Sequence, residues 1–307
     1  MGKIRVVFMG TPSYATEILK ALLKEENFEI CALFTQSDKP ANRGKLLTPP
    51  HIKSFVLENY PDIPIYQPTS IRDEETKNIL KSYNPDFIVV AAYGKILPLD
   101  ILNIAPCINL HASLLPKYRG ASPIQYTILN DDSFGGVTAM KMEQGLDSGE
   151  MLGYTYVNAK GVDVNTLFDE LSKKASKLTI KILNNYNKIL HVKQNDAQVS
   201  FARKIVKEDG LCDFTFTCKE LTQKFLAYNP WPGLYLQNGI KLKAFTCKQQ
   251  KHNFKIGEIV SINDTSIEVA CYDGFVNITR LNPPSKQEMN AADFIRGKRI
   301  EVGNTLN

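Results

Sequence analysis

Long apolar runs in the first half of the chain constrain its fold more than any other feature. IRVVFMG (4–10), DFIVVAA (86–92) and CINLHAS (107–113) are dominated by apolar residues. Such runs are typical of parallel strands that helices cover on both faces of a sheet. A stripe of apolar residues at helical spacing follows the first run, between Ala15 and Leu23. The sequence therefore predicts a doubly wound, mostly parallel α/β sheet, of Rossmann type.

The last third of the sequence has a different pattern. Short β-rich runs such as LYLQNGIKLKAFTC (234–247) contain or precede the pairs Asn-Gly (238–239) and Asp-Gly (273–274), which are hairpin turn signals. One helical segment, CKELTQKFLAY (218–228), lies among them. Several short strands with one helix predict a small, OB-like β-barrel. We expect an α/β domain over residues 1–190, a polar linker over 191–207 and the barrel over 208–307.

Composition argues against several classes of protein. No apolar run approaches the roughly 20 residues of a membrane span, and the apolar stretch near residue 4 is too brief for a signal peptide. We therefore expect a cytoplasmic protein without a membrane partner. The six cysteines and four histidines show neither a CxxC pair nor metal-ligand spacing. Reduced thiols and no metal are the expectation.

The net charge of +5 is unevenly distributed. Residues 203–307 hold 15 Lys and Arg against 11 Asp and Glu, whereas residues 1–202 hold 22 against 21. A basic module suits a polyanionic partner such as nucleic acid. An excess of this size is also ordinary variation among soluble proteins, so charge alone leaves both interpretations open.

Polar residues interrupt the apolar strand at 107–113. Asn109 and His111 are two residues apart, so both side chains point to one face of the strand. Asp147, in a loop with Gly145 and Gly149, is a candidate partner. Such a set suits acyl transfer without a covalent intermediate: Asn109 and His111 would donate to an oxyanion, and Asp147 would hold the imidazole and handle a proton. A structural histidine is the alternative.

Six segments carry a resemblance to a known family. FMGTPSYA, FTQSDKPANRGK, VVAAYGKILP, INLHASLLPKYRGASPIQ, GLDSGEML and YNPWPG together resemble the methionyl-tRNA formyltransferases, in that family's order and along nearly the whole chain. The resemblance implies a two-domain enzyme that transfers the formyl group of 10-formyltetrahydrofolate to the amino group of methionine on initiator tRNA. It also suggests a monomer.

The resemblance implies roles for individual positions. The catalytic set is Asn109, His111 and Asp147. Folate binding falls on Val90, Ala91, Ala92, Tyr93 and Gly94 and on Ser113, Leu114, Leu115 and Pro116. Contacts with tRNA fall on the loop 37–50, with Lys39, Arg43 and Lys45, and on Lys207 near the domain join. Basic side chains on a loop suit phosphates or base edges, although a solvated basic loop is the simpler interpretation.

Two other functions remain open at this stage. The same Asn, His and Asp set would serve another enzyme that uses 10-formyltetrahydrofolate, either a formyltransferase for a small amine or a hydrolase. The chain could also be a tRNA-binding module without activity. A small substrate needs neither the basic loop 37–50 nor a barrel domain, and all three catalytic positions are occupied. Both observations favour the tRNA enzyme.

Overall fold

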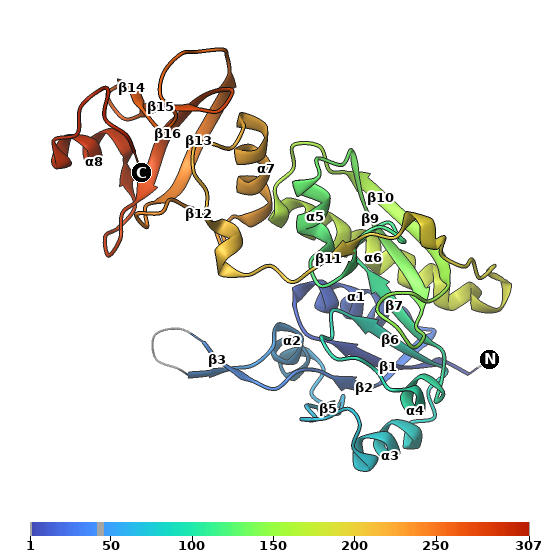
Figure 1. Cartoon of the computed structure of the whole chain (residues 1–307). Coiled ribbons are helices and arrows are strands. Elements are labelled where there is room, and N and C mark those ends of the chain that lie inside the picture. Colours follow the sequence, from blue (N-terminus) through green and yellow to red (C-terminus); the bar gives the residue numbers. More distant parts are fainter. Residues whose placement is uncertain (1, 42–45, 307) are drawn as a thin grey trace. The chain divides into compact units, whose positions relative to one another are not determined.

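The computed structural model describes residues 2–41 and 46–306. The chain forms two compact units (Figure 1). The first contains residues up to 123, together with 134–158 and 165–202, and the second contains 124–133, 159–164 and the residues from 203 onward. Two short segments from the first 202 residues therefore group with the C-terminal unit.

A seven-stranded sheet forms the centre of the first unit. Its order is β10-β9-β7-β6-β1-β2-β5. The strands are β1 (Ile4–Gly10), β2 (Phe28–Phe34), β5 (Ile65–Tyr66), β6 (Phe87–Ala91), β7 (Cys107–His111), β9 (Phe134–Lys141) and β10 (Met151–Asn158). Pairing is parallel from β5 to β7, whereas β9 is antiparallel to both β7 and β10. The prediction of a doubly wound, mostly parallel sheet is confirmed.

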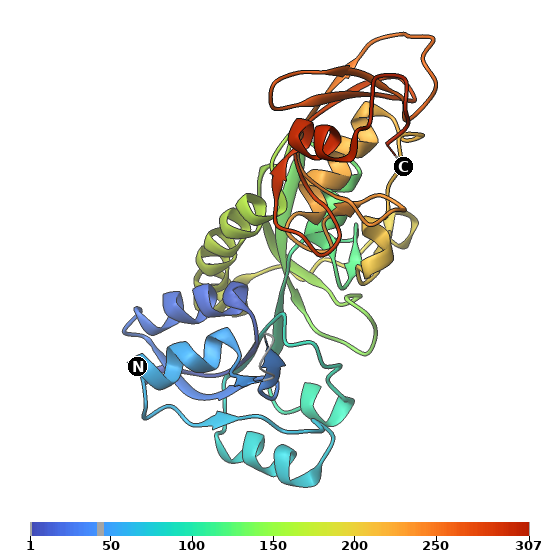
Figure 2. The ribbon, with the colours of Figure 1, turned by 90° about the vertical axis from the view of Figure 1, so that its left-hand side faces the viewer.

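Helices cover both faces of this sheet (Figure 2). They are α1 (Ser13–Leu23), α2 (His51–Asn59), α3 (Glu74–Ser82), α4 (Leu99–Leu102) and α6 (Val164–Asn185). On one face α1 contacts α6, where the rings of Tyr14 and Phe168 lie 5.8 Å apart. On the other face Leu80 of α3 and Ile101 of α4 pack in one core with Val7, Met9, Ile88 and Val90. All five residues of β6 are buried, as its apolar sequence predicts.

The strand order reverses beside β1. The chain passes from β1 through β2 to β5 on one side and then returns to β6 and β7 on the other. Ligand sites in open α/β sheets form at such a point, outside the carboxyl ends of the strands. The Thr11 hydroxyl, just after β1, donates to the carbonyl of Tyr93, just after β6, over 3.4 Å. The fold thus brings the ends of β1, β6 and β7 to one edge.

The second unit is a small antiparallel β domain. Its sheet has the order β12-β13-β16-β15-β14, with β17 paired to β16. The elements are β12 (Leu234–Tyr235), β13 (Lys241–Gln249), β14 (Ile259–Ile262), β15 (Ile267–Cys271), β16 (Gly274–Asn282), β17 (Met289–Asn290), α7 (Cys218–Tyr228) and α8 (Ala291–Lys298). Both predicted turns connect strands, the first β12 to β13 and the second β15 to β16. A small C-terminal β domain is confirmed; in the described residues no strand pair joins β14 to β12.

Several short elements complete the chain. They are β3 (Lys39–Ala41), β4 (Leu46–Thr48), β8 (Arg119–Gly120), α5 (Pro123–Leu129), β11 (Phe201–Ala202) and the 3-10 turns Tyr186–Lys188, Asp196–Gln198 and Lys207–Gly210. β8 and β11 pair in parallel, which ties the segment after β7 to residues near 200. Among the helices of the described chain, none has the length and apolarity needed to cross a membrane.

We predict that shortening Ile88 destabilises the first unit. Its side chain is 0% exposed in the core between β6 and α3, so Ile88→Ala removes buried methyl groups and leaves a cavity. The expected loss is about 2–5 kcal/mol in the free energy of unfolding, measured by urea titration. The control is Ile96→Ala, since Ile96 is 75% exposed; a change there of more than roughly 0.5 kcal/mol would contradict the burial argument.

Candidate active site

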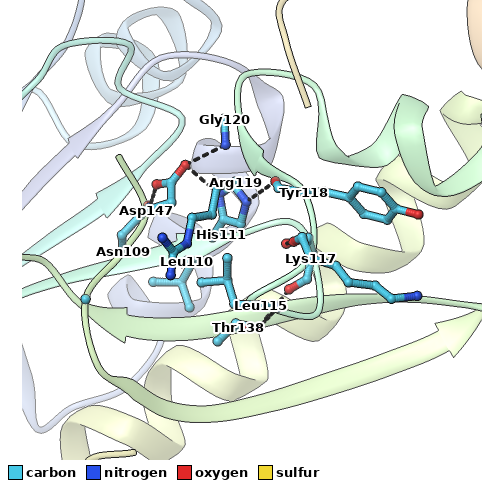
Figure 3. Close-up of polar contacts among 12 residues, drawn as sticks. Asn109, Leu110, His111, Leu115, Lys117, Tyr118, Arg119, Gly120, Thr138 and Asp147 are labelled. Atoms are coloured by element: carbon cyan, nitrogen blue, oxygen red, sulfur yellow. Dashed lines mark hydrogen bonds and ion pairs between the residues drawn. The ribbon is translucent and has the colours of Figure 1, made fainter. Parts of the chain in front are cut away.

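Asn109, His111 and Asp147 converge at the carboxyl end of β7 (Figure 3). The Asn109 amide donates to Asp147 Oδ1 over 3.4 Å, and His111 Nδ1 lies 3.6 Å from Asp147 Oδ2. The side chains of His111 and Asp147 are only 7% and 14% exposed. The structure therefore brings together the three polar residues that the sequence singled out, around one partly buried carboxylate.

Both ring nitrogens of His111 face oxygen atoms. Nε2 lies 2.9 Å from the carbonyl oxygen of Tyr118, which can only accept, so Nε2 carries a proton. Nδ1 faces the Asp147 carboxylate. A neutral imidazole protonated at Nε2 satisfies the carbonyl alone, whereas an imidazolium donates toward both oxygens. This geometry places both ring nitrogens of His111 against oxygen atoms that accept hydrogen bonds.

The loop that carries Asp147 has a constrained backbone. Asp147 has φ +48° and Gly145 has φ +141°, both in the left-handed range. A Cβ at Gly149 would lie 1.8 Å from the carbonyl oxygen of Lys141, so only glycine fits there. The Gly120 N–H donates to Asp147 Oδ2 over 2.9 Å. The carboxylate is thus fixed by one backbone donor and one amide donor, which stabilise its charged form.

The segment that resembles a folate-binding motif is fixed against β9. Thr138 donates to the carbonyl of Ser113 over 2.8 Å and accepts from the N–H of Leu115 over 3.0 Å. Ser113 and Leu115 are buried, while Leu114 and Pro116 are half-buried. A Cβ at Gly136 would lie 2.3 Å from Leu114 Cδ2, so this glycine makes room for Leu114. Only the half-buried side chains of this segment offer surface to a ligand.

The second segment that resembles a folate-binding motif is 90–94, at the end of β6, and most of its side chains are buried. The side chains of Val90, Ala91 and Tyr93 are buried, whereas Ala92 and Gly94 are exposed. Ala92 and Gly94 have φ +45° and +77°, which turns the chain sharply at the sheet edge. Burial raises the pKa of Tyr93 to about 12, so its hydroxyl stays neutral. Ala92 and Gly94 are therefore the exposed residues of this segment, while the carbonyl of Tyr93 accepts from Thr11 and from Gln36.

The basic loop 37–50 contains a β-hairpin, and hydrogen bonds fix the residues just before it. β3 and β4 pair antiparallel, and Lys53 donates to the Asp38 carboxylate over 2.9 Å. Hydrogen bonds from Gln67 and Lys53 lower the pKa of Asp38 below its usual value. Lys39 donates to Gln36 Oε1 over 2.7 Å.

Three other basic positions are predicted to contact tRNA. Arg43 and Lys45 lie outside the described residues. Lys207 is exposed in the second unit, where its carbonyl accepts from the Tyr235 hydroxyl over 3.2 Å.

Four contacts at the site had no signal in the sequence. They come from the carbonyl of Tyr118, the N–H of Gly120, the hydroxyl of Thr138 and the side-chain amide of Gln194. Gln194 donates to the carbonyl oxygens of Asp147 and Gly149, each over 2.8 Å. Every residue has backbone groups, so the sequence does not indicate which of them will contact the site. Gln194 lies in the segment that we expected to be a linker.

The second unit brings together thiols that the sequence separates. The sulfur atoms of Cys218 and Cys271 are 3.5 Å apart, and a carboxylate oxygen of Asp273 lies within 4.8 Å of both. Burial raises the pKa of both thiols. The two oxygens of Asp273 accept from the Cys218 N–H and from Gln249, each over 2.7 Å. The carboxylate therefore has a structural role at the start of α7.

Comparison with known families defines the class of this chain. Residues 3–183 match the model of the formyl transferase family, and residues 204–299 match the model of the formyl transferase C-terminal domain. Together these matches cover both halves of the protein. The chain therefore has the two domains of a formyl transferase.

Similar proteins of known function indicate which formyl transferase family the chain belongs to. A methionyl-tRNA formyltransferase of a Nitratiruptor species is 48% identical over 304 residues, which cover 99% of this chain and 100% of the relative. One from Campylobacter hominis is 47% identical over 303 residues, with 99% and 100% coverage. The chain belongs to the methionyl-tRNA formyltransferase family.

Solved structures share the fold at low identity. WlaRD, a sugar 3N-formyl transferase crystallised with dTDP and 5-N-formyl-THF, matches with a TM-score of 0.67 and 18% identity over 94% of this chain and 100% of its own. An N-formyltransferase from Helicobacter canadensis, in complex with folinic acid and dTDP-3-aminofucose, gives 0.66 and 18% over 92% and 100%. At this identity the likeness establishes the fold alone.

We predict that Gly149→Ala damages both stability and activity. The added Cβ would meet the Lys141 backbone carbonyl at 1.8 Å, so the Asp147 loop must shift. The expected loss is about 2–4 kcal/mol in the free energy of unfolding, together with more than about tenfold in turnover. Gly297→Ala is the control, since no atom lies within 4 Å of its Cβ position in α8. A Gly149→Ala enzyme with normal turnover would contradict the argument.

Proposed function

We propose that this chain transfers the formyl group of 10-formyltetrahydrofolate to the amino group of methionyl initiator tRNA, giving N-formylmethionyl-tRNA for translation initiation. The convergence of Asn109, His111 and Asp147 at the carboxyl end of β7 carries the proposal. The identity of 48% over nearly the full length of a methionyl-tRNA formyltransferase supports this choice of substrate.

The proposed chemistry is direct attack by the neutral amine. Its nitrogen bonds to the formyl carbon, which places negative charge on the formyl oxygen. The bond from that carbon to N10 of the folate then breaks, and N10 takes up the proton that the amine released. Asn109 has one N–H directed at Asp147 and a second left for the oxyanion. Asp147 receives the proton of the attacking amine. His111 stabilises the oxyanion together with Asn109, and Nε2 of its ring lies 2.9 Å from the Tyr118 carbonyl.

Folate binding is proposed along two segments that flank the catalytic set. The exposed residues Ala92 and Gly94 would supply peptide donors and acceptors at the end of β6. Leu114 and Pro116 supply half-buried apolar surface on the segment that Thr138 fixes. Pockets for small molecules combine such apolar walls with a few placed polar groups. No metal is needed for this reaction, because the residues themselves can stabilise the charge and move the proton.

The tRNA is proposed to meet the basic loop and the second unit. Lys39, Arg43 and Lys45 lie on the loop 37–50, and Lys207 is exposed near the start of the second unit. Residues 203–307 also hold most of the net positive charge. Basic side chains bind the phosphate backbone through electrostatic attraction, which salt weakens. We further propose that the enzyme acts as a monomer in the cytoplasm, as the resemblance implies.

A formyl-transfer assay tests the proposal. Purified protein receives 10-formyltetrahydrofolate labelled on the formyl group, with charged initiator tRNA, charged elongator tRNA or a small amine as acceptor. Label on initiator tRNA alone is the expected result. Label on the small amine, or formate released without an acceptor, would replace this function with that of another folate-dependent formyl enzyme. Binding of tRNA without any transfer would indicate an inactive module.

We predict that Asn109→Ala, His111→Ala and Asp147→Ala each lower turnover by about 10²–10³-fold, because each removes a group that handles charge or a proton in the transition state. Circular dichroism should show that the variants stay folded. Asp62→Ala serves as the control, since Asp62 is exposed on another part of the first unit. A near-normal rate for Asp147→Ala would remove Asp147 from the mechanism.

We predict that Arg43→Ala weakens the use of tRNA and spares folate. Loss of one basic contact with the acceptor end should raise the KM for tRNA by about tenfold and leave the KM for folate unchanged. The effect should shrink at high salt. Lys24→Ala removes one exposed charge at the end of α1 and serves as the matched control. An unchanged KM for tRNA would place Arg43 outside the tRNA site.

A further inference from the structure

Gln194 is attached to the loop that presents Asp147. Its side-chain nitrogen donates to the carbonyl oxygens of Asp147 and Gly149, each over 2.8 Å. Its side-chain oxygen accepts from Arg119 Nε over 3.0 Å. The Gln194 amide thus binds the loop backbone on both sides of residue 148, and Arg119 in turn fixes the amide. All of these residues belong to the first unit.

The loop between β9 and β10 needs such support. Asp147 adopts φ +48°, a conformation that residues other than glycine rarely adopt. Strained backbone of this kind persists only where the surroundings determine it. The contacts of the carboxylate with Asn109 and Gly120 fix the end of the side chain. The contacts of Gln194 fix the backbone from which that side chain starts.

Arg119 connects the contacts that fix the Asp147 carboxylate with those that fix its backbone. Its side chain is buried, and its guanidinium donates to Gln194 and lies 3.6 Å from a carboxylate oxygen of Asp196. The next residue, Gly120, donates its N–H to Asp147. Pairing of β8 with β11 fixes both Arg119 and Gly120. The same short strand therefore holds Asp147 directly through Gly120 and indirectly through Gln194.

We propose that Gln194 is a positioning residue for formyl transfer, which holds the Asp147 loop so that the carboxylate meets the attacking amine. This inference rests on the proposed function, because it assigns Asp147 the proton. A displacement of about 1 Å in a catalytic group can cost about a hundredfold in rate. Gln194 would therefore act on the rate of the chemical step and leave substrate binding alone.

A simpler role for Gln194 is to anchor the segment 191–198 to Arg119. Two substitutions separate the roles. Gln194→Met keeps the length and removes every hydrogen bond. Gln194→Glu keeps an acceptor for Arg119, now with an opposite charge, but places a carboxylate oxygen against the two loop carbonyls. The anchor role predicts normal activity for Gln194→Glu, whereas the positioning role predicts that both variants lose activity.

The test measures kcat and both KM values for the two variants. We expect kcat to fall by about ten- to a hundredfold in each, with KM for folate and tRNA within about twofold of the original enzyme. Gln198→Met, an exposed position four residues along the same segment, should behave as the original enzyme. Normal kcat in folded Gln194→Glu, or a loss expressed only in KM, would overturn the proposal.

A double-mutant cycle ties the effect to Asp147. Single-turnover rates are compared for Asp147→Asn with and without Gln194→Met. A positioning role predicts that Gln194→Met slows the Asp147→Asn enzyme by less than about twofold, since the group it positions is already gone. An equal loss in both backgrounds would overturn the proposal. A normal rate for Asp147→Asn alone would instead show that the proposed function has the wrong proton acceptor.

Discussion

The bond from the Gly120 N–H to the Asp147 carboxylate joins two loops that are 27 residues apart in the sequence. One loop follows β7 and the other connects β9 to β10. The antiparallel pairing of β7 with β9 places Lys141, at the end of β9, opposite Ile108, and the loop that follows then carries Asp147 to Asn109. A partly buried carboxylate needs donors, because desolvation without them would cost several kcal/mol. Gly120 and Asn109 supply those donors, so the rest of the site forms around this carboxylate.

His111 lies next to the Asp147 carboxylate. Its ring lies between the Tyr118 carbonyl and Asp147, with an acceptor on each side. The side chains of His111 and Asp147 are largely buried, so both groups are held by fixed protein contacts. The proposed reaction creates an oxyanion and releases a proton within the same few ångströms. A site whose polar groups are already fixed in place can accept both changes without large rearrangement.

Local patterns in the sequence determined much of this outcome. Apolar runs predicted β1, β6 and β7, and the position of Asn109 and His111 at the end of β7 followed from the period of a strand. Asp147, in a loop with Gly145 and Gly149, was a candidate partner from the sequence, and the family resemblance implied the same residue. The roles of Val90 to Gly94 and Ser113 to Pro116 remain proposals, and the structure adds that several of these side chains are buried. A ligand would therefore meet backbone more than side chains at 92–94.

Other contacts could not be predicted, because they involve backbone groups or polar side chains that no local sequence pattern distinguishes. The donor on Asp147 is a backbone N–H, and the restraint on its loop comes from Gln194 in a segment whose polar composition indicated a linker. The meeting of Cys218 with Cys271 likewise arises from sheet pairing in the second unit.

The sequence by itself determined the class of fold, the strand ends and the chemical types at the site, because burial and strand period are local properties. Only the tertiary structure decided which partner each polar group has, because hydrogen bonds between distant segments depend on how the strands are ordered.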